Sequence, residues 1–166
     1  TGRSDSLSQP LPIELAAGGP LHVVQREWVE IPRWTELRGF IVDRQLTALS
    51  QYFTSEHFPL LFAARDTVAQ HARTFVEKQL GPAMPMPHAV VDLAWVPERK
   101  TFVVIELNPF GRSSGAALFS WKEDAPTLLG RGPFQCRVSA AEAASRSEAV
   151  ETARGEAEGR GPRAEG

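Results

Sequence analysis

The segment from Ala89 to Gly115 constrains the fold more than any other part of the chain, because it holds two apolar runs separated by a polar turn. Residues 89–96 and 101–107 are rich in β-branched and aliphatic side chains, and Pro97-Glu98-Arg99-Lys100 lies between them. Two such runs joined by a short polar connection are typical of a β-hairpin. We therefore predict two paired antiparallel strands in this segment.

The predicted hairpin has two different faces, because side chains alternate along a strand. If even-numbered residues pair with even-numbered residues, one face is purely apolar and is expected to lie in the core. Its members are Val91, Leu93, Trp95, Val103, Ile105 and Leu107. The members of the opposite face are Val90, Asp92, Ala94, Val104, Glu106 and Asn108.

The acidic residues of this second face need an explanation. Asp92 and Glu106 are expected to lie opposite each other, and like charges in that position destabilise a sheet. At about 4 Å and an effective dielectric of about 20, the repulsion is on the order of 4 kcal/mol. A Mg²⁺ ion bound by both carboxylates and the amide oxygen of Asn108, with water and phosphate oxygens in its other positions, would offset this repulsion. Alternatively, one carboxyl is protonated or turned to solvent at a sheet edge, and the spacing by itself favours this second explanation.

The composition narrows the class of protein. With 166 residues and 42% hydrophobic content, the chain is expected to bury one domain core. A net charge of -2 argues against a general nucleic-acid-binding surface. Cys136 is the single cysteine, so an internal disulfide is excluded and a reducing, cytoplasmic location is expected. No run has the length of a membrane span and no signal peptide is evident, so we expect no membrane partner.

Three further strands are predicted before the hairpin, as an antiparallel meander. They cover residues 21–31, 36–42 and 46–53, and the last two are joined by a turn at residues 43–45. In the middle strand one face carries Glu36, Arg38 and Phe40, and the other carries Leu37 and Ile41.

A helix is predicted between the meander and the hairpin. Asp66 is the expected N-cap, and Gly81-Pro82 is the expected end. The apolar stripe of this helix consists of Val68, Ala72, Phe75, Val76 and Leu80. The fold class is therefore α+β, with an antiparallel sheet against which the helix packs. Residues 1–20 are expected to be a flexible lead-in, and residues 139–166 are expected to be a disordered tail.

The sequence around Asn108 resembles a known family. Residues 106–111, ELNPFG, and residues 117–121, ALFSW, are similar to the magnesium-binding end of ATP-grasp proteins. They are most similar to the cell-division-cycle protein 123 family, in which an acid, an apolar residue and NPFG precede an LLFSW-like segment. That family usually has Asp where this chain has Glu106, whereas Glu is common among ATP-grasp proteins generally. The resemblance extends over roughly residues 21–138, and it implies that Asp92, Glu106 and Asn108 bind Mg²⁺.

The meander carries the rest of the resemblance. VVQREWVEI, TELRGFIV and LTALSQYF resemble the strands that frame the nucleotide in the same family. The resemblance implies that Arg38 is a catalytic group that points at the phosphates of ATP, and a guanidinium suits that role because it forks onto phosphate oxygens. It also implies that Glu36 lies beside the nucleotide and that adenine lies against a linker formed by Gln25, Arg26, Glu27, Trp28 and Val29. The alternative for the charged residues Arg26, Glu36 and Arg38 is a ladder of exposed cross-strand ion pairs.

The resemblance leaves more than one function open. It implies the C-terminal half of an ATP-grasp protein, because the phosphate-contacting Lys and glycine-rich lid of the first half have no counterpart in this sequence. One function is an ATP- and Mg²⁺-dependent ligase, in which a carboxylate is phosphorylated and then attacked by a nucleophile. The other is an ATP-dependent assembly factor for translation initiation factor 2, acting through its γ subunit. A third possibility is a truncated, non-catalytic copy.

Overall fold

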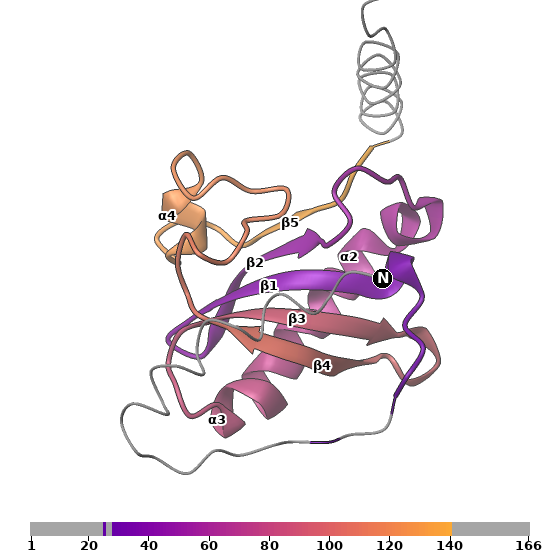
Figure 1. The fold of residues 1–166 in the computed structure, drawn as a ribbon, viewed down its shortest axis with the longest axis horizontal. Coiled ribbons are helices and arrows are strands. Elements are labelled where there is room, and N and C mark those ends of the chain that lie inside the picture. The colour runs from indigo at the N-terminus through magenta and orange to yellow at the C-terminus, as the bar shows by residue number, and fades with distance from the viewer. Residues whose placement is uncertain (1–24, 26–27, 141–166) are drawn as a thin grey trace, which may run out of the picture. The chain divides into compact units, whose positions relative to one another are not determined.

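A single mixed sheet organises the part of the chain that the structure describes. The computed structural model describes Gln25 and residues 28–140 (Figure 1). Its five strands have the spatial order β4-β3-β1-β2-β5. Their bounds are Glu36–Val42 for β1, Gln45–Gln51 for β2, Ala89–Val96 for β3, Thr101–Asn108 for β4 and Gln135–Arg137 for β5. The pairing is antiparallel throughout, except that β5 runs parallel to β2.

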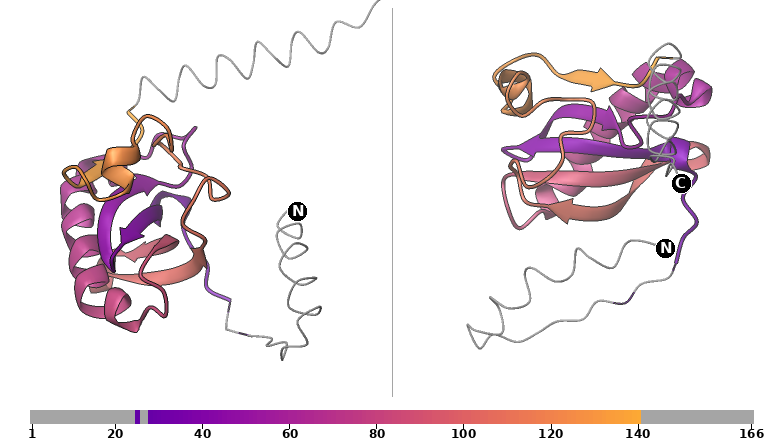
Figure 2. Two further views of the ribbon diagram at one scale, coloured as in Figure 1. Left: turned by 90° about the vertical axis from the view of Figure 1, so that its left-hand side faces the viewer. Right: turned by 45° about the horizontal axis from the view of Figure 1, so that its top comes forward.

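A long helical segment lies along one face of this sheet, as Figure 2 shows. It consists of α2 (Pro59–Phe75), one π-helical turn η3 (Val76–Leu80) and α3 (Gly81–Ala83). The short helical turns elsewhere are η2 (Arg33–Thr35), η4 (Pro97–Arg99) and α4 (Ala125–Leu128). Sheet and helix together confirm the predicted α+β class. No helix among the described residues is long and apolar enough to span a membrane.

Both predicted ends of the long helix are wrong. The helix begins at Pro59 rather than near Asp66, and proline suits the first helical turn because the N–H that it lacks would have no partner there. Gly81 continues the helix with right-handed dihedrals instead of ending it. A Cβ at Gly81 would lie 2.5 Å from the carbonyl oxygen of Arg44, in the turn between β1 and β2. Gly81 is therefore required for close packing of the helix on this turn.

The main core lies between the helix and the sheet. Within the predicted stripe, Val68, Ala72 and Val76 are fully buried, while Phe75 and Leu80 are half-buried. They belong to or pack against a cluster that the sheet supplies from alternate positions, including Leu37, Ile41, Leu49, Val91 and Leu93. The predicted division of β1 into two faces is confirmed, because Leu37 and Ile41 face this core and Phe40 belongs to a second cluster.

The hairpin is confirmed, but its register changes at a bulge. Asp92 pairs with Glu106 as expected, whereas Leu93 pairs with Val104, so Ile105 is an extra residue. The bulge turns Val104 and Phe102 towards the core and leaves Val103 41% exposed. Leu107 is 39% exposed because β4 is an edge strand, so the prediction of a fully buried apolar face is wrong at these positions.

The first predicted strand, residues 21–31, is not found in the described residues. Residues 21–24, 26 and 27 lie outside the described part, and the remaining residues of the segment form no strand. Both edges of β1 are occupied, by β2 on one side and by β3 on the other. The hairpin strand β3 therefore takes the place that the meander assigned to residues 21–31.

The second face of the sheet is covered by the connection between β4 and β5. An aromatic cluster lies on it, in which Phe40 contacts Phe119 and Trp121 edge to face, with ring centroids 5.8 and 5.5 Å apart. Ala48, Val90 and Leu128 complete the buried part of the cluster. Figure 2 shows this connection and α2 on opposite sides of the sheet. The strand β3 is consequently buried on both faces.

Candidate functional site

One row of directly paired residues crosses all five strands on the face opposite α2. In the order of the strands it runs from Glu106 through Asp92, Arg38 and Ser50 to Arg137. Directly paired residues point to the same side of a sheet, and neighbouring strands lie about 4.8 Å apart. The row therefore brings two carboxylates and two guanidinium groups onto one face, although they are far apart in the sequence.

Arg38 and Asp92 form the centre of the site. The Arg38 Nε and Nη2 atoms donate to Oδ1 and Oδ2 of Asp92, each at 2.8 Å. The third nitrogen, Nη1, donates to the carbonyl oxygen of Gly115 at 2.9 Å, and the guanidinium carbon lies 4.9 Å from the centre of the Tyr52 ring. Arg38 therefore does not belong to the ladder of exposed ion pairs that was the alternative for it. It belongs to a cross-strand pair whose side chains are 12% and 2% exposed.

The protonation of Asp92 reflects competing influences. Burial raises the pKa of the Asp92 carboxyl, the hydrogen bonds and charge of Arg38 lower it, and nearby Glu106 raises it again. The net result is a pKa above the ordinary value for aspartate. The hydrogen bonds to Asp92 also raise the pKa of Arg38, which therefore stays charged. The site therefore places one guanidinium beside two acids.

Asn108 bridges the two acids. Its Nδ2 lies 3.4 Å from Asp92 Oδ2 and 3.1 Å from Glu106 Oε1. The amide places an electropositive hydrogen-bond donor where the two carboxylates converge, and a half-turn of the amide would present its oxygen instead. The structure thus brings the three predicted metal ligands together on one face.

The donor set fits a hard divalent cation. Mg²⁺ prefers oxygen ligands and usually binds one or two carboxylates together with water and phosphate oxygens. Asp92 and Glu106 carry carboxylate oxygens on two strands, and Asn108 would add its amide oxygen after the half-turn described above. Among the described residues no group of three or more His, Cys, Asp or Glu could hold a metal. The site is thus limited to two acids and one amide, and it suits an ion that keeps other ligands.

The predicted adenine linker is only partly described. Arg26 and Glu27 lie outside the described residues, and Gln25, Trp28 and Val29 are exposed and belong to no strand. Glu36 is buried at the start of β1, where it pairs with Ala94 of β3. The assignment of these residues to a nucleotide stays a prediction.

Sequence reasoning missed three contributors to the site. Tyr52 packs against Arg38, and Ser50 is fully buried at the paired position of β2. The carbonyl oxygen of Gly115 accepts a hydrogen bond from Arg38 Nη1. A Cβ at Gly115 would lie 3.3 Å from Arg38 Nη1, so glycine allows this close approach. The SSG sequence at residues 113–115 follows closely after the NPFG sequence of residues 108–111. Its contact with Arg38 depends on pairing between segments 77 residues apart.

The Asp92 end of the row does not line either large cavity, whereas Arg137 at the other end lines one of about 400 Å³. A cavity of about 580 Å³ lies between α2 and β5 and is lined by Arg65, Arg73, Phe134 and Cys136, among others. Burial raises the pKa of the Cys136 thiol to about 12, so it is protonated at neutral pH. No residue of the Asp92 site lines this cavity. The chemistry proposed below therefore concerns the exposed edge of the row rather than an enclosed pocket.

Comparison with known proteins gives related sequences and a related fold. The family model described as D123 matches residues 13–156. A "Translation initiation factor eIF2 assembly protein" from Ajellomyces capsulatus is 34% identical over 104 residues, which cover 63% of this chain and 24% of that protein. A "Cell division cycle protein 123" from Phaeosphaeria nodorum is 32% identical over 104 residues, which cover 63% of this chain and 27% of that protein.

A solved structure has a similar fold. Cdc123 from Schizosaccharomyces pombe matches with a TM-score of 0.57 at 20% identity, over 69% of this chain and 45% of that one. At this identity the match concerns the fold alone. The chain spans about a quarter of the length of the curated relatives named above, which are matched over 24% and 27% of their residues.

Proposed function

This chain belongs to the D123 family, and on that premise we propose that it supplies the metal-binding side of an ATP·Mg²⁺ site in an assembly protein for translation initiation factor 2. The observation that carries the nucleotide part is the convergence of Asp92, Glu106 and Asn108 on one face, beside the guanidinium of Arg38. The names of the relatives support the assembly part.

Each residue of the site has a distinct role under this proposal. Asp92, Glu106 and Asn108 hold the ion, which supplies positive charge to phosphate oxygens when it is bound. Arg38 is fixed by Asp92, Gly115 and Tyr52, and its charge lies next to the carboxylates that hold the ion. A guanidinium held in this way can donate to phosphate oxygens with little further loss of side-chain freedom.

The proposed partner is translation initiation factor 2, with its γ subunit as the proposed point of contact. The relative from Ajellomyces capsulatus bears the name "Translation initiation factor eIF2 assembly protein", and the chain covers 24% of its length. The chain is therefore proposed as one part of the assembly activity. The cytoplasmic location expected from the single cysteine stays a prediction.

The ligase function stays a prediction as well. It requires a carboxylate substrate and a nucleophile, and none of the described contacts identifies a site for either. Release of ADP that depends on a small carboxylate substrate would support it. The assembly function instead predicts that binding of the initiation factor depends on ATP.

Calorimetric titration tests the nucleotide part of the proposal. We expect the chain to bind Mg²⁺·ATP and Glu106→Gln to bind it at least tenfold more weakly, because a charged ligand is replaced by a neutral one. Glu98→Gln is a matched control, because Glu98 is an exposed acid at the hairpin turn. Equal affinities of the wild type, Glu106→Gln and Glu98→Gln, or no binding by the wild type, would refute the nucleotide proposal.

A pull-down with purified initiation factor 2 subunits tests the partner. We expect the γ subunit to be retained by the immobilised chain, and more of it to be retained with Mg²⁺·ATP than without. Glu106→Gln should abolish the difference made by Mg²⁺·ATP. Retention that is equal with and without nucleotide would separate the partner from the metal site.

A further inference from the structure

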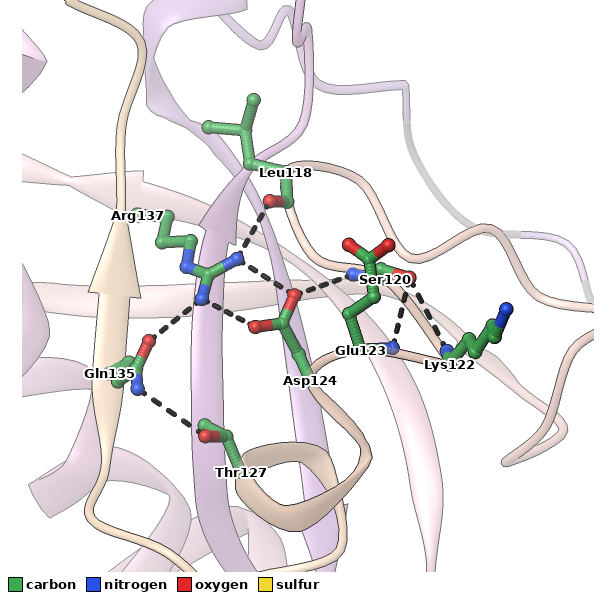
Figure 3. Close-up of polar contacts among 8 residues, drawn as sticks. All are labelled: Leu118, Ser120, Lys122, Glu123, Asp124, Thr127, Gln135 and Arg137. Atoms are coloured by element: carbon green, nitrogen blue, oxygen red, sulfur yellow. Dashed lines mark hydrogen bonds and ion pairs between the residues drawn. The ribbon is translucent and has the colours of Figure 1, made fainter.

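A second arginine and aspartate form a fork at the far end of the row. Arg137 Nη1 and Nη2 donate to Asp124 Oδ2 and Oδ1 at 2.8 and 2.6 Å (Figure 3). Gln135 Oε1 accepts a further hydrogen bond from Nη2 at 3.0 Å, and the guanidinium carbon lies 4.1 Å from the centre of the Phe119 ring. Arg137 is therefore held on several sides, as Arg38 is.

This fork fixes the connection that follows β4. Arg137 Nη1 donates to the carbonyl oxygen of Leu118 at 3.2 Å, and Asp124 Oδ2 accepts from the backbone N–H of Ser120 at 2.8 Å. The N–H of Leu118 donates to the hydroxyl of Ser50 at 3.1 Å. Ser50 is paired with both Arg38 and Arg137 across the sheet, so the connection is anchored between the two arginines.

The same connection reaches Arg38. The Trp121 indole Nε1 donates to the carbonyl oxygen of Ser114 at 2.7 Å, and the Ser114 hydroxyl donates to the carbonyl oxygen of Pro109 at 2.6 Å. The next residue is Gly115, whose carbonyl oxygen accepts from Arg38 Nη1. A continuous set of hydrogen bonds and ring contacts thus leads from Asp124 and Arg137 to the guanidinium in the candidate site.

We propose that Asp124 and Arg137 are positioning residues for Arg38, and that they act by holding the Gly115 carbonyl at the place where it orients the Arg38 guanidinium towards bound phosphate. This inference rests on the proposed function as far as phosphate is concerned. A role in stability alone explains the fork less well. Its side chains are 35% and 18% exposed, and ion pairs with such exposure contribute little to stability. Most of the hydrogen bonds that Arg137 donates are accepted by Leu118 and Asp124, which belong to the connection that carries Gly115.

The first test is spectroscopic and needs no nucleotide. In ¹⁵N-labelled chain we expect Arg137→Gln to shift the Arg38 Nε–H signal and the Trp121 indole signal. The Trp95 indole signal should stay in place, because Trp95 belongs to the core on the α2 side of the sheet. Arg65→Gln breaks an ion pair with Asp66 on α2 and is the matched control that should leave the Arg38 signal unchanged. Gly115→Ala should shift the Arg38 Nε–H signal directly, because a Cβ at Gly115 would lie 3.3 Å from Arg38 Nη1. This shift assigns the signal to Arg38.

A milder variant guards against loss of folding. Asp124→Asn keeps an oxygen for the N–H of Ser120 but removes the charge that pairs with Arg137, so it should shift the Arg38 signal less than Arg137→Gln does. Unchanged Arg38 and Trp121 signals in both variants, with both chains folded, would overturn the inference. A shift of the Trp95 signal as large as that of Trp121 would also overturn it, because the effect would then be general.

The second test measures the consequence for binding. We expect Arg137→Gln to bind Mg²⁺·ATP about tenfold more weakly than the wild type, with Arg65→Gln unchanged, because a misplaced guanidinium loses one hydrogen bond between charged groups. Equal affinity of Arg137→Gln and the wild type would overturn the link to phosphate. No binding by the wild type would refute the proposed function, and the Arg38 signal would still decide the positioning role.

Discussion

The two faces of the sheet are built in different ways. The α2 face is a continuous apolar core, in which alternate positions of four strands meet the stripe of one long helix. The opposite face combines an aromatic cluster around Phe40 with the charged row that contains Asp92, Arg38 and Arg137. It is covered by a long connection with little regular structure. Hydrophobic burial thus organises one face, and specific polar contacts organise much of the other.

This difference determines what each face tolerates. Apolar contacts are non-directional, so the α2 face depends mainly on volume and close approach. A buried ion pair adds little net stability when it is intact, but loss of one partner leaves an uncompensated charge. We therefore expect substitutions on the α2 face to be costly where space is limited, and substitutions in the row to be costly where they leave a charge unpaired.

The largest effect is expected when Arg38 is removed. Arg38→Met leaves the carboxylate of Asp92, which is 1% exposed, without its guanidinium partner. We expect a loss of about 3 to 5 kcal/mol in the free energy of unfolding at neutral pH, measured by urea denaturation. The double variant Arg38→Met/Asp92→Leu should recover most of this loss, because no buried charge remains.

Arg65→Met provides the matched control for this prediction. It removes an arginine from an ion pair on α2 whose side chains are 46% and 86% exposed. Such a pair should contribute only about 0 to 1 kcal/mol. If Arg38→Met lowers the free energy of unfolding no more than Arg65→Met does, the pair of Arg38 and Asp92 behaves like an ordinary exposed ion pair. The proposed difference between the two faces would then be wrong for the charged row.

A smaller effect is expected at Gly81, on the helical side. Alanine normally stabilises a helix by about 1 kcal/mol relative to glycine. At Gly81 a Cβ would lie 2.5 Å from the Arg44 carbonyl oxygen and 2.9 Å from that of Val76, and overpacking of this kind costs about 1 to 3 kcal/mol. We expect Gly81→Ala to lower the free energy of unfolding. A Cβ at Gly111 would meet nothing within 4 Å, so Gly111→Ala is the control. A stabilised Gly81→Ala would show that the helix packs loosely.

Local patterns predicted the parts of both faces that depend on neighbouring residues. Two apolar runs separated by a polar turn predicted the hairpin, and alternation with even-to-even pairing placed Asp92 opposite Glu106. The apolar stripe predicted Val68, Ala72 and Val76 as core residues. The turn at Asp43 and Arg44 joins β1 and β2 as expected, and both residues have positive φ, as two-residue hairpin turns require.

The rest depends on contacts between distant segments, which local patterns do not specify. The bulge at Ile105 moves Val104 and Phe102 into the core, and nothing in the alternation of residues 101–107 marks it. The choice of β3 as the neighbour of β1 decides that Arg38 pairs with Asp92. The parallel placement of β5 puts Arg137 in the same row. Asp92 and Glu106 could therefore be found from the sequence, whereas the partnership of Arg38 with Asp92 and the pair of Arg137 and Asp124 could not.

The smallest effect concerns the pH dependence of the free energy of unfolding, which should differ between Asp124 and Asp92. The hydrogen bonds from Arg137 hold the pKa of Asp124 below its ordinary value. The stability that this pair adds is therefore fully present above the unfolded-state pKa of aspartate and is lost as the pH falls through the lower folded-state pKa. Asp124→Asn should lower the free energy of unfolding by up to about 1 kcal/mol at neutral pH and by progressively less in acid.

The pH dependence that Asp92 contributes has the opposite sign. Because the folded-state pKa of Asp92 is raised, the free energy of unfolding falls as the pH rises from the unfolded-state pKa to the folded-state pKa. Urea denaturation across the acid range checks both signs, and parallel profiles for Asp124→Asn and Asp92→Asn would contradict this assignment.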